Sequence, residues 1–135
     1  GYPDRAAERE LLRGQDRRGM LEKLQPVLTP ADLARLQQAV ASVHTAEPVL
    51  EYLQDLVAAT RSGRWFAQGL SPRAALAVVR SAKAQAFLNG RDYVAPDDIA
   101  AILPQTVAHR LIPVSDAGRG AVEQVRAMVE ATPLP

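Results

Sequence analysis

Two arginines in one predicted helix are the residues of this chain whose type and spacing best suit binding an anion. A helix is predicted from about residue 72 to 88, and at about 100° per residue Arg73 and Arg80 fall on one face of it, together with two alanines. Small side chains let another surface approach, and an arginine could then bind a phosphate through two hydrogen bonds. Spacing alone favours a solvated arginine at a helix end. Arg73, however, stands in the first turn, where a cation opposes the helix dipole, and this favours an anion-binding role.

No pattern typical of a complete catalytic centre accompanies these arginines. Cysteine is absent, which excludes disulfides and thiolate chemistry. His44 and His109 lie far apart, and neither has a serine at a spacing typical of nucleophilic catalysis. We expect His109 to be structural or to contact another domain. The chain also has no glycine-rich phosphate loop and no hydrophobic strand ending in acidic residues that could hold magnesium. By itself it is expected to be inactive.

A short connector leads from the helix of residues 72–88 to the next predicted helix. Gly90 is suited to the left-handed conformation that ends a helix. Two adjacent acids, Asp97 and Asp98, would allow a metal site, but no histidine or third acid lies nearby, so we expect them to cap the following helix. Arg91 and Asp92 are expected to form a local ion pair, of a kind that contributes little when exposed.

The elements that must position these residues are predicted to be helices, about five to six in an all-α bundle. Helix signals cover about residues 4–13, 30–43, 47–61, 72–88, 96–111 and 117–131, with one further turn at 20–24. A loop is expected around Gly14 and Gly19, and Pro104 is expected to break or kink its helix. Val94 or residues 112–114 could form an isolated bridge. The helix of residues 72–88 is apolar on nearly every face and is expected to be central.

Composition supports one compact helical domain. The 135 residues are 47% hydrophobic but only 4% aromatic, which favours closely packed helices over sheets. Trp65 and Phe66 are expected to anchor their loop to the core, although a partner site is the alternative. The net charge of +1 gives no general nucleic-acid signature, and no segment is long and apolar enough for a membrane span. The chain opens at Gly1 without an initiator methionine or signal peptide, so we expect it to begin inside a longer, cytoplasmic protein.

Two strings of residues with a helix between them resemble the lid of the MoxR family of AAA+ ATPases. They are Gly69-Leu70-Ser71-Pro72-Arg73-Ala74 and Gly90-Arg91-Asp92-Tyr93-Val94-Ala95-Pro96-Asp97-Asp98-Ile99. Three shorter strings agree in order: Gly1-Tyr2-Pro3, Ala59-Thr60-Arg61 and His109-Arg110-Leu111. The resemblance runs from residue 1 to about 111, and the loop of residues 62–68 departs from it. It implies a helical bundle of the AAA+ lid type, with residues 1–13 as a junction after the ATPase core and residues 14–135 as the lid.

In that family the arginine that matches Arg73 is the sensor-2 residue, which reaches the nucleotide phosphates. The resemblance therefore implies that Ser71, Pro72 and Arg73 bind nucleotide, and that Arg73 acts in catalysis only together with the ATPase core. It implies ATP and Mg²⁺ as cofactors of the full-length protein, with neither bound to this chain alone. The implied partners are the protein's own AAA+ core, a homo-oligomeric ring of the hexameric type and a von Willebrand factor A-domain protein. The implied activity is protein remodelling or chaperone-like activation.

Two other interpretations fit an all-helical chain. One is a histone-fold-like helical DNA-binding module, whose phosphate-binding surface would use the basic residues Arg61, Arg64, Arg73, Arg80, Lys83 and Arg91. The near-neutral charge argues against it. The other is a plain helical protein-interaction bundle, which a large exposed apolar patch would favour.

Overall fold

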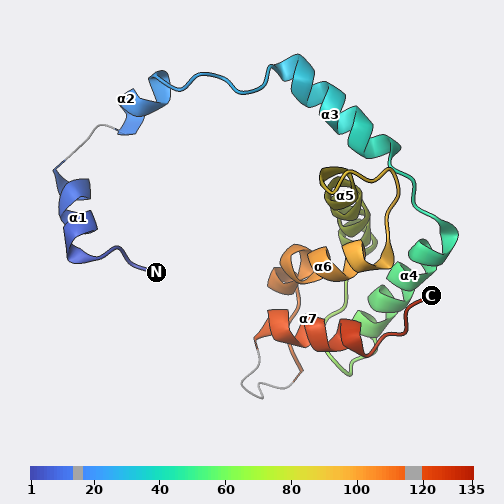
Figure 1. Cartoon of the computed structure of the whole chain (residues 1–135). Coiled ribbons are helices and arrows are strands. Elements are labelled where there is room, and N and C mark those ends of the chain that lie inside the picture. The colour runs from blue at the N-terminus through green and yellow to red at the C-terminus, as the bar shows by residue number, and fades with distance from the viewer. Residues whose placement is uncertain (14–16, 115–119) are drawn as a thin grey trace. The chain divides into compact units, whose positions relative to one another are not determined.

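The computed structural model describes residues 1–13, 17–114 and 120–135. Every regular secondary-structure element in these ranges, apart from isolated bridges, is a helix (Figure 1). The α-helices are α1 (Arg5–Leu12), α2 (Arg17–Glu22), α3 (Pro30–Ser42), α4 (Glu47–Arg61), α5 (Pro72–Leu88), α6 (Pro96–Val107) and α7 (Ala121–Glu130), and a 3₁₀ turn, η1 (Ala108–Arg110), follows α6. Pairing between extended segments is limited, within these ranges, to two isolated bridges, His44 with Tyr93 and Phe66 with Pro113. The all-α prediction is confirmed. None of the described helices is long and apolar enough to span a membrane.

The chain divides into two compact units, Gly1–Leu33 and Ala34–Pro135. In the first unit the Asp4 side chain caps α1 by accepting a hydrogen bond from the amide of Ala7, and no residue of α1 is buried. Gly19 lies inside α2 and not in a loop, so that part of the prediction is wrong; Gly14 lies outside the described residues. A glycine costs a helix only about 1 kcal/mol, which neighbouring residues can offset.

The second unit is built around α6, which contacts α4, α5, α7 and η1. In Figure 1 it lies between α5 and α7. We expected α5 to be central, and this is wrong. Helix α5 buries only one stripe of small residues, Ala74, Val78, Ala82 and Ala86, while Leu76 is 59% exposed. The stripe repeats every fourth residue, so it forms one face of the helix, and its small side chains allow a neighbouring helix to approach closely.

Three further local features can be compared with the predictions: Pro104, the start of α7 and the isolated bridges. Helix α6 continues through Pro104 to Val107 before the chain tightens into η1, so the proline does not break it. Pro104 is buried between Leu103 and Val107, which are fully buried, and this packing offsets the missing backbone hydrogen bond. The described helix α7 begins at Ala121, and the predicted start at about residue 117 lies outside the described residues. The bridge at Pro113 falls within the predicted segment 112–114, and the other lies beside Val94.

Candidate functional site

The N-terminal end of α5 presents the predicted site residues to solvent. Ser71 is the N-cap, with extended backbone, and its side chain accepts a hydrogen bond of 3.3 Å from the amide of Ala74. Pro72 occupies the first helical position, where a missing amide proton costs nothing. Ser71, Pro72 and Arg73 are all exposed. Arg73 makes no hydrogen bond or ion pair with any residue in the described ranges. The fold therefore leaves this cation available to an external anion.

The other basic residues of α5 differ from Arg73. Arg80 is exposed and lies about 10 Å further along the helix axis, at about 1.5 Å per residue, so it is two turns from the helix start. Lys83 is used by the fold, because its Nζ donates a hydrogen bond of 3.0 Å to the carbonyl of Ala41 at the end of α3. Arg73 is thus the basic residue of α5 that stands at the helix N-terminus, where the first amides also attract an anion.

The residue just before this site, Leu70, is held by the end of α4 through both of its backbone groups. Its amide donates a hydrogen bond of 3.0 Å to the buried hydroxyl of Thr60. Its carbonyl accepts two hydrogen bonds from Arg61, at 2.9 Å from Nε and 2.7 Å from Nη2. The Thr60 hydroxyl in turn donates 2.6 Å to the carbonyl of Val57. We call this set, Thr60 and Arg61 on Leu70, the Leu70 clamp.

Gly69 is required for this close approach. A Cβ atom placed on Gly69 would lie 2.8 Å from the Cα of Arg61 and still closer to its Cγ. Real Cβ atoms essentially never come so near to a backbone atom, so a side chain at position 69 would push the loop away from α4. The string Gly69-Leu70 therefore has a steric reason to begin with glycine.

The loop from Ser62 to Leu70 is anchored in the core, as predicted for its aromatic residues. Phe66 is 1% exposed and forms the bridge with Pro113, and the Trp65 ring packs partly buried against the core. Gln124 on α7 donates a hydrogen bond of 2.8 Å to the carbonyl of Trp65. The loop is thereby fixed at its middle as well as at its end.

At the opposite end of α5, Arg91 pairs with Asp98 and not with Asp92, which corrects the prediction. The guanidinium binds both carboxylate oxygens of Asp98, at 2.7 Å from Nη1 to Oδ2, and the same Oδ2 caps α6 by accepting 2.8 Å from the amide of Ala95. Asp98 is 4% exposed and the Arg91 side chain 28%. The hydrogen bond from Arg91 lowers the pKa of Asp98 below its usual value and outweighs the opposing effect of burial.

The expected capping role of Asp98 is therefore confirmed. Asp97, its neighbour, lies exposed in the first turn of α6. Within the described residues, no three His, Cys, Asp or Glu side chains are grouped where they could hold a metal ion. His109 is exposed and accepts a hydrogen bond of 3.0 Å from Arg110, so the fold does not bury it.

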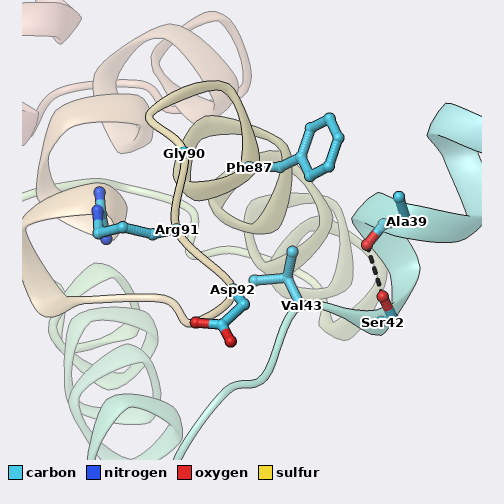
Figure 2. A pocket seen from close by; sticks show the side chains of 7 residues that line it. All are labelled: Ala39, Ser42, Val43, Phe87, Gly90, Arg91 and Asp92. Atoms are coloured by element: carbon cyan, nitrogen blue, oxygen red, sulfur yellow. Dashed lines mark hydrogen bonds between the residues drawn. The ribbon is translucent and has the colours of Figure 1, made fainter.

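A pocket of about 310 Å³ also lies at this opposite end of α5 and is separate from Arg73 (Figure 2). Two of its polar side chains are already engaged: Arg91 binds Asp98, and the hydroxyl of Ser42 donates 2.8 Å to the carbonyl of Ala39. The third, Asp92, is an acid and would repel a phosphate. Its remaining lining is mainly apolar, with the Phe87 ring standing at one side. It offers no free cation for a phosphate, so the candidate phosphate site remains the start of α5.

The sequence predicts the helix caps and makes Arg73 a candidate, but it gives no indication of the Leu70 clamp or of Asp98 as the partner of Arg91. The strings Ala59-Thr60-Arg61 and Gly69-Leu70 belong to separate pieces of the resemblance. Their contact is tertiary. Glycine next to a helix start was the one local signal that could have indicated a close approach at position 69.

Comparisons with known proteins agree with this arrangement. A family model described as AAA lid domain matches residues 58–131. The uncharacterised protein YeaC of Bacillus subtilis is 35% identical over 138 residues, which cover all of this chain and 43% of YeaC. Chaperone MoxR1 of Mycobacterium tuberculosis is 34% identical over 127 residues, which cover 87% of this chain and 33% of MoxR1.

A solved structure shows the same fold. The crystal structure of a candidate ATPase from Cytophaga hutchinsonii matches with a TM-score of 0.78 and 26% identity, over all of this chain and 44% of that protein. The chain thus spans less than half the length of each of these relatives. The domain model and the MoxR relatives favour the lid interpretation over a DNA-binding module or a plain interaction bundle. This chain belongs to the AAA lid domain family and is a lid of the MoxR-type AAA+ ATPases.

Proposed function

We propose that this lid closes over ATP in a complete MoxR-type ATPase and that Arg73 is its sensor-2 arginine. The observation that carries the proposal is the exposed guanidinium of Arg73 at the start of α5, which has no partner among the described residues. It stands in the string Ser71-Pro72-Arg73, which matches the family's motif. A fold that does not use a cation placed against the helix dipole can offer it to a ligand phosphate.

The residues present suit one part of an ATP site. Arg73 could neutralise charge on the phosphates, and its planar fork suits two hydrogen bonds to phosphate oxygens. Bound ATP with Mg²⁺ would supply the phosphoryl group and the metal charge. The described residues of this chain offer no carboxylate cluster for magnesium, so the ATPase core would have to hold the metal.

Hydrolysis would be coupled to motion of the lid as a body. Helix α6 joins α4, α5 and α7 in one core, so a force on Arg73 at the start of α5 would move these helices together. We place the junction with the ATPase core in residues 1–13 and the lid in residues 14–135. We further propose a cytoplasmic, ring-forming ATPase of the hexameric type that remodels or activates other proteins, with a von Willebrand factor A-domain protein as partner.

The test uses Arg73→Ala in the polypeptide that joins this chain to its ATPase core. We expect ATP turnover to fall roughly 10-fold or more, because a positioned guanidinium is lost from the phosphate site. Arg73→Lys should restore only part of the rate, since lysine keeps the charge but not the planar fork. Arg80→Ala, two turns along the same helix, is the matched control and should leave turnover nearly unchanged.

Stability separates a functional from a structural role. In the 135-residue chain, Arg73→Ala should change the free energy of unfolding by no more than about 0.5 kcal/mol. The reason is that the exposed Arg73 side chain makes no hydrogen bond or ion pair among the described residues. The same chain alone should not hydrolyse ATP. If Arg73→Ala destabilises the lid while turnover of the surviving complete enzyme stays normal, Arg73 is structural and the proposed role is wrong.

A further inference from the structure

The position of Arg73 depends on how the start of α5 is held. Leu70 lies three positions before Arg73, at the end of a loop that begins at Ser62. A loop of this length would allow the helix start to shift if packing alone held it. The Leu70 clamp removes this freedom, because both the amide and the carbonyl of Leu70 bind side chains of α4.

The end of α4 is itself fixed in the core. Tyr52, Leu53, Leu56 and Val57 are buried, and Thr60, one turn later, is fully buried. The Thr60 hydroxyl donates its proton to Val57, so it can only accept from the amide of Leu70. Its orientation is therefore determined, and the clamp transmits the position of α4 to the start of α5.

Arg61 adds direction to this attachment. Two nitrogen atoms of its guanidinium converge on one carbonyl oxygen, an arrangement that the single ammonium of lysine cannot reproduce. Gly69 lets the backbone come close enough for these bonds to form. Thr60, Arg61 and Gly69 thus all determine the position of the backbone at Leu70.

We propose that Thr60 and Arg61 are positioning residues that set where Arg73 meets the nucleotide phosphates. This inference rests on the proposed sensor-2 role of Arg73. Neither residue needs to touch the nucleotide, because each acts on Leu70 and, through it, on the first turn of α5. A displacement of about 1 Å in a phosphate-binding group is enough to slow catalysis many-fold.

A double-mutant cycle in the complete ATPase tests the dependence on Arg73. Arg61→Lys should lower kcat by roughly 5- to 50-fold when Arg73 is present, with a smaller change in KM. In the Arg73→Ala background the same substitution should have no further effect. Arg64→Lys is the matched control, because Arg64 lies in the loop from Ser62 to Leu70 and stacks on Trp65 without binding Leu70.

The clamp itself is tested by hydrogen exchange in the 135-residue chain. Thr60→Val should speed exchange of the Leu70 amide roughly 10-fold or more relative to the amide of Val78 in α5, whereas Thr60→Ser should restore protection. Thr106→Val is the matched control, because the Thr106 hydroxyl bonds only within its own helix. If Thr60→Val does not fold, Thr60→Ala, which also removes the hydroxyl that accepts from the Leu70 amide, carries the same comparison with Thr60→Ser.

Four outcomes are distinguishable. Loss of turnover in Arg61→Lys that vanishes in the Arg73→Ala background supports the inference. Equal losses in both backgrounds overturn it, since Arg61 would then act on the nucleotide or on the fold independently. Normal turnover in Arg61→Lys, with turnover reduced in Arg73→Ala, overturns the inference but leaves the sensor-2 role intact. Normal turnover in Arg73→Ala overturns the sensor-2 role and the inference with it. Hydrogen exchange of the Leu70 amide would then show only whether the Leu70 clamp forms.

Discussion

The pairing of Arg91 with Asp98 should stabilise the lid far more than the exposed acids beside it. Asp98→Asn keeps the shape of the side chain and one oxygen that can accept from the amide of Ala95, but it removes the charge that binds Arg91. Breaking a fully buried ion pair costs about 3–5 kcal/mol, and an exposed pair contributes about 0–1 kcal/mol. Asp98 is 4% exposed and Arg91 28%, so we expect a cost between these limits, about 2–3 kcal/mol.

Urea unfolding followed by circular dichroism of the helices measures this difference. Asp92→Asn and Asp97→Asn are matched controls, because both acids are exposed and each loses the same charge. Both controls should change the free energy of unfolding by about 0.5 kcal/mol or less. If Asp98→Asn costs no more than Asp92→Asn, the ion pair described here does not stabilise the lid and the reasoning is refuted.

The pH dependence of the free energy of unfolding tests the role of the Asp98 charge independently. The pKa of Asp98 is lowered in the folded chain, mainly by the hydrogen bond from Arg91, whereas the pKa of an unfolded aspartate is about 3.9. The stabilisation is therefore fully present above the unfolded pKa and is lost as the pH falls through the lower, folded pKa. The difference between the wild type and Asp98→Asn should narrow below about pH 4. A difference that stays constant down to low pH would show that the charge of Asp98 is not its cause.

Three further predictions concern packing, backbone and local stability. Phe66→Ala should lower the free energy of unfolding in urea by about 3–5 kcal/mol, because Phe66 is fully buried. Phe87→Ala should lower it clearly less, because Phe87 is only partly buried, and equal losses would contradict this difference in burial. Gly90→Ala should cost about 1 kcal/mol or more in thermal unfolding, because Gly90 has φ +73°. Gly120→Ala should cost less, about 0.5 kcal/mol from the weaker N-cap alone, because its φ is −63° and its Cβ would meet open space; equal costs would contradict the role of the positive φ. Hydrogen exchange should be fast throughout α1, which has no buried residue, and slow in α6; similar protection in both would refute this assignment.

Local signals in the sequence were sufficient to predict most helix boundaries. Proline at the first or second position and a glycine beyond the last residue give α4 and α5 the predicted bounds of 47–61 and 72–88. Such signals act within a few residues, so they can be recognised without knowledge of the rest of the fold. The same holds for Ser71, whose capping role precedes Arg73 by two positions.

Tertiary relationships could not be predicted in this way. Arg91 and Asp92 are adjacent in sequence, but Arg91 binds Asp98, and Figure 2 shows the side chains of Arg91 and Asp92 leaving the backbone in different directions. Adjacency in sequence therefore does not imply contact between side chains. Pro104 is a helix breaker by local rules, yet its burial in α6 offsets this. Hydrophobicity marked α5 as apolar all round, but only packing decides which face is buried.

The most direct measurement of the central claim is a crystal structure of the complete ATPase bound to Mg²⁺ and a non-hydrolysable ATP analogue. We predict that a guanidinium nitrogen of Arg73 lies about 2.7–2.9 Å from a phosphate oxygen, with Ser71 still capping α5. Arg80 should remain away from the phosphates. An Arg73 side chain that points into solvent or binds a carboxylate of the protein, while the lid is closed over the nucleotide, would contradict the account.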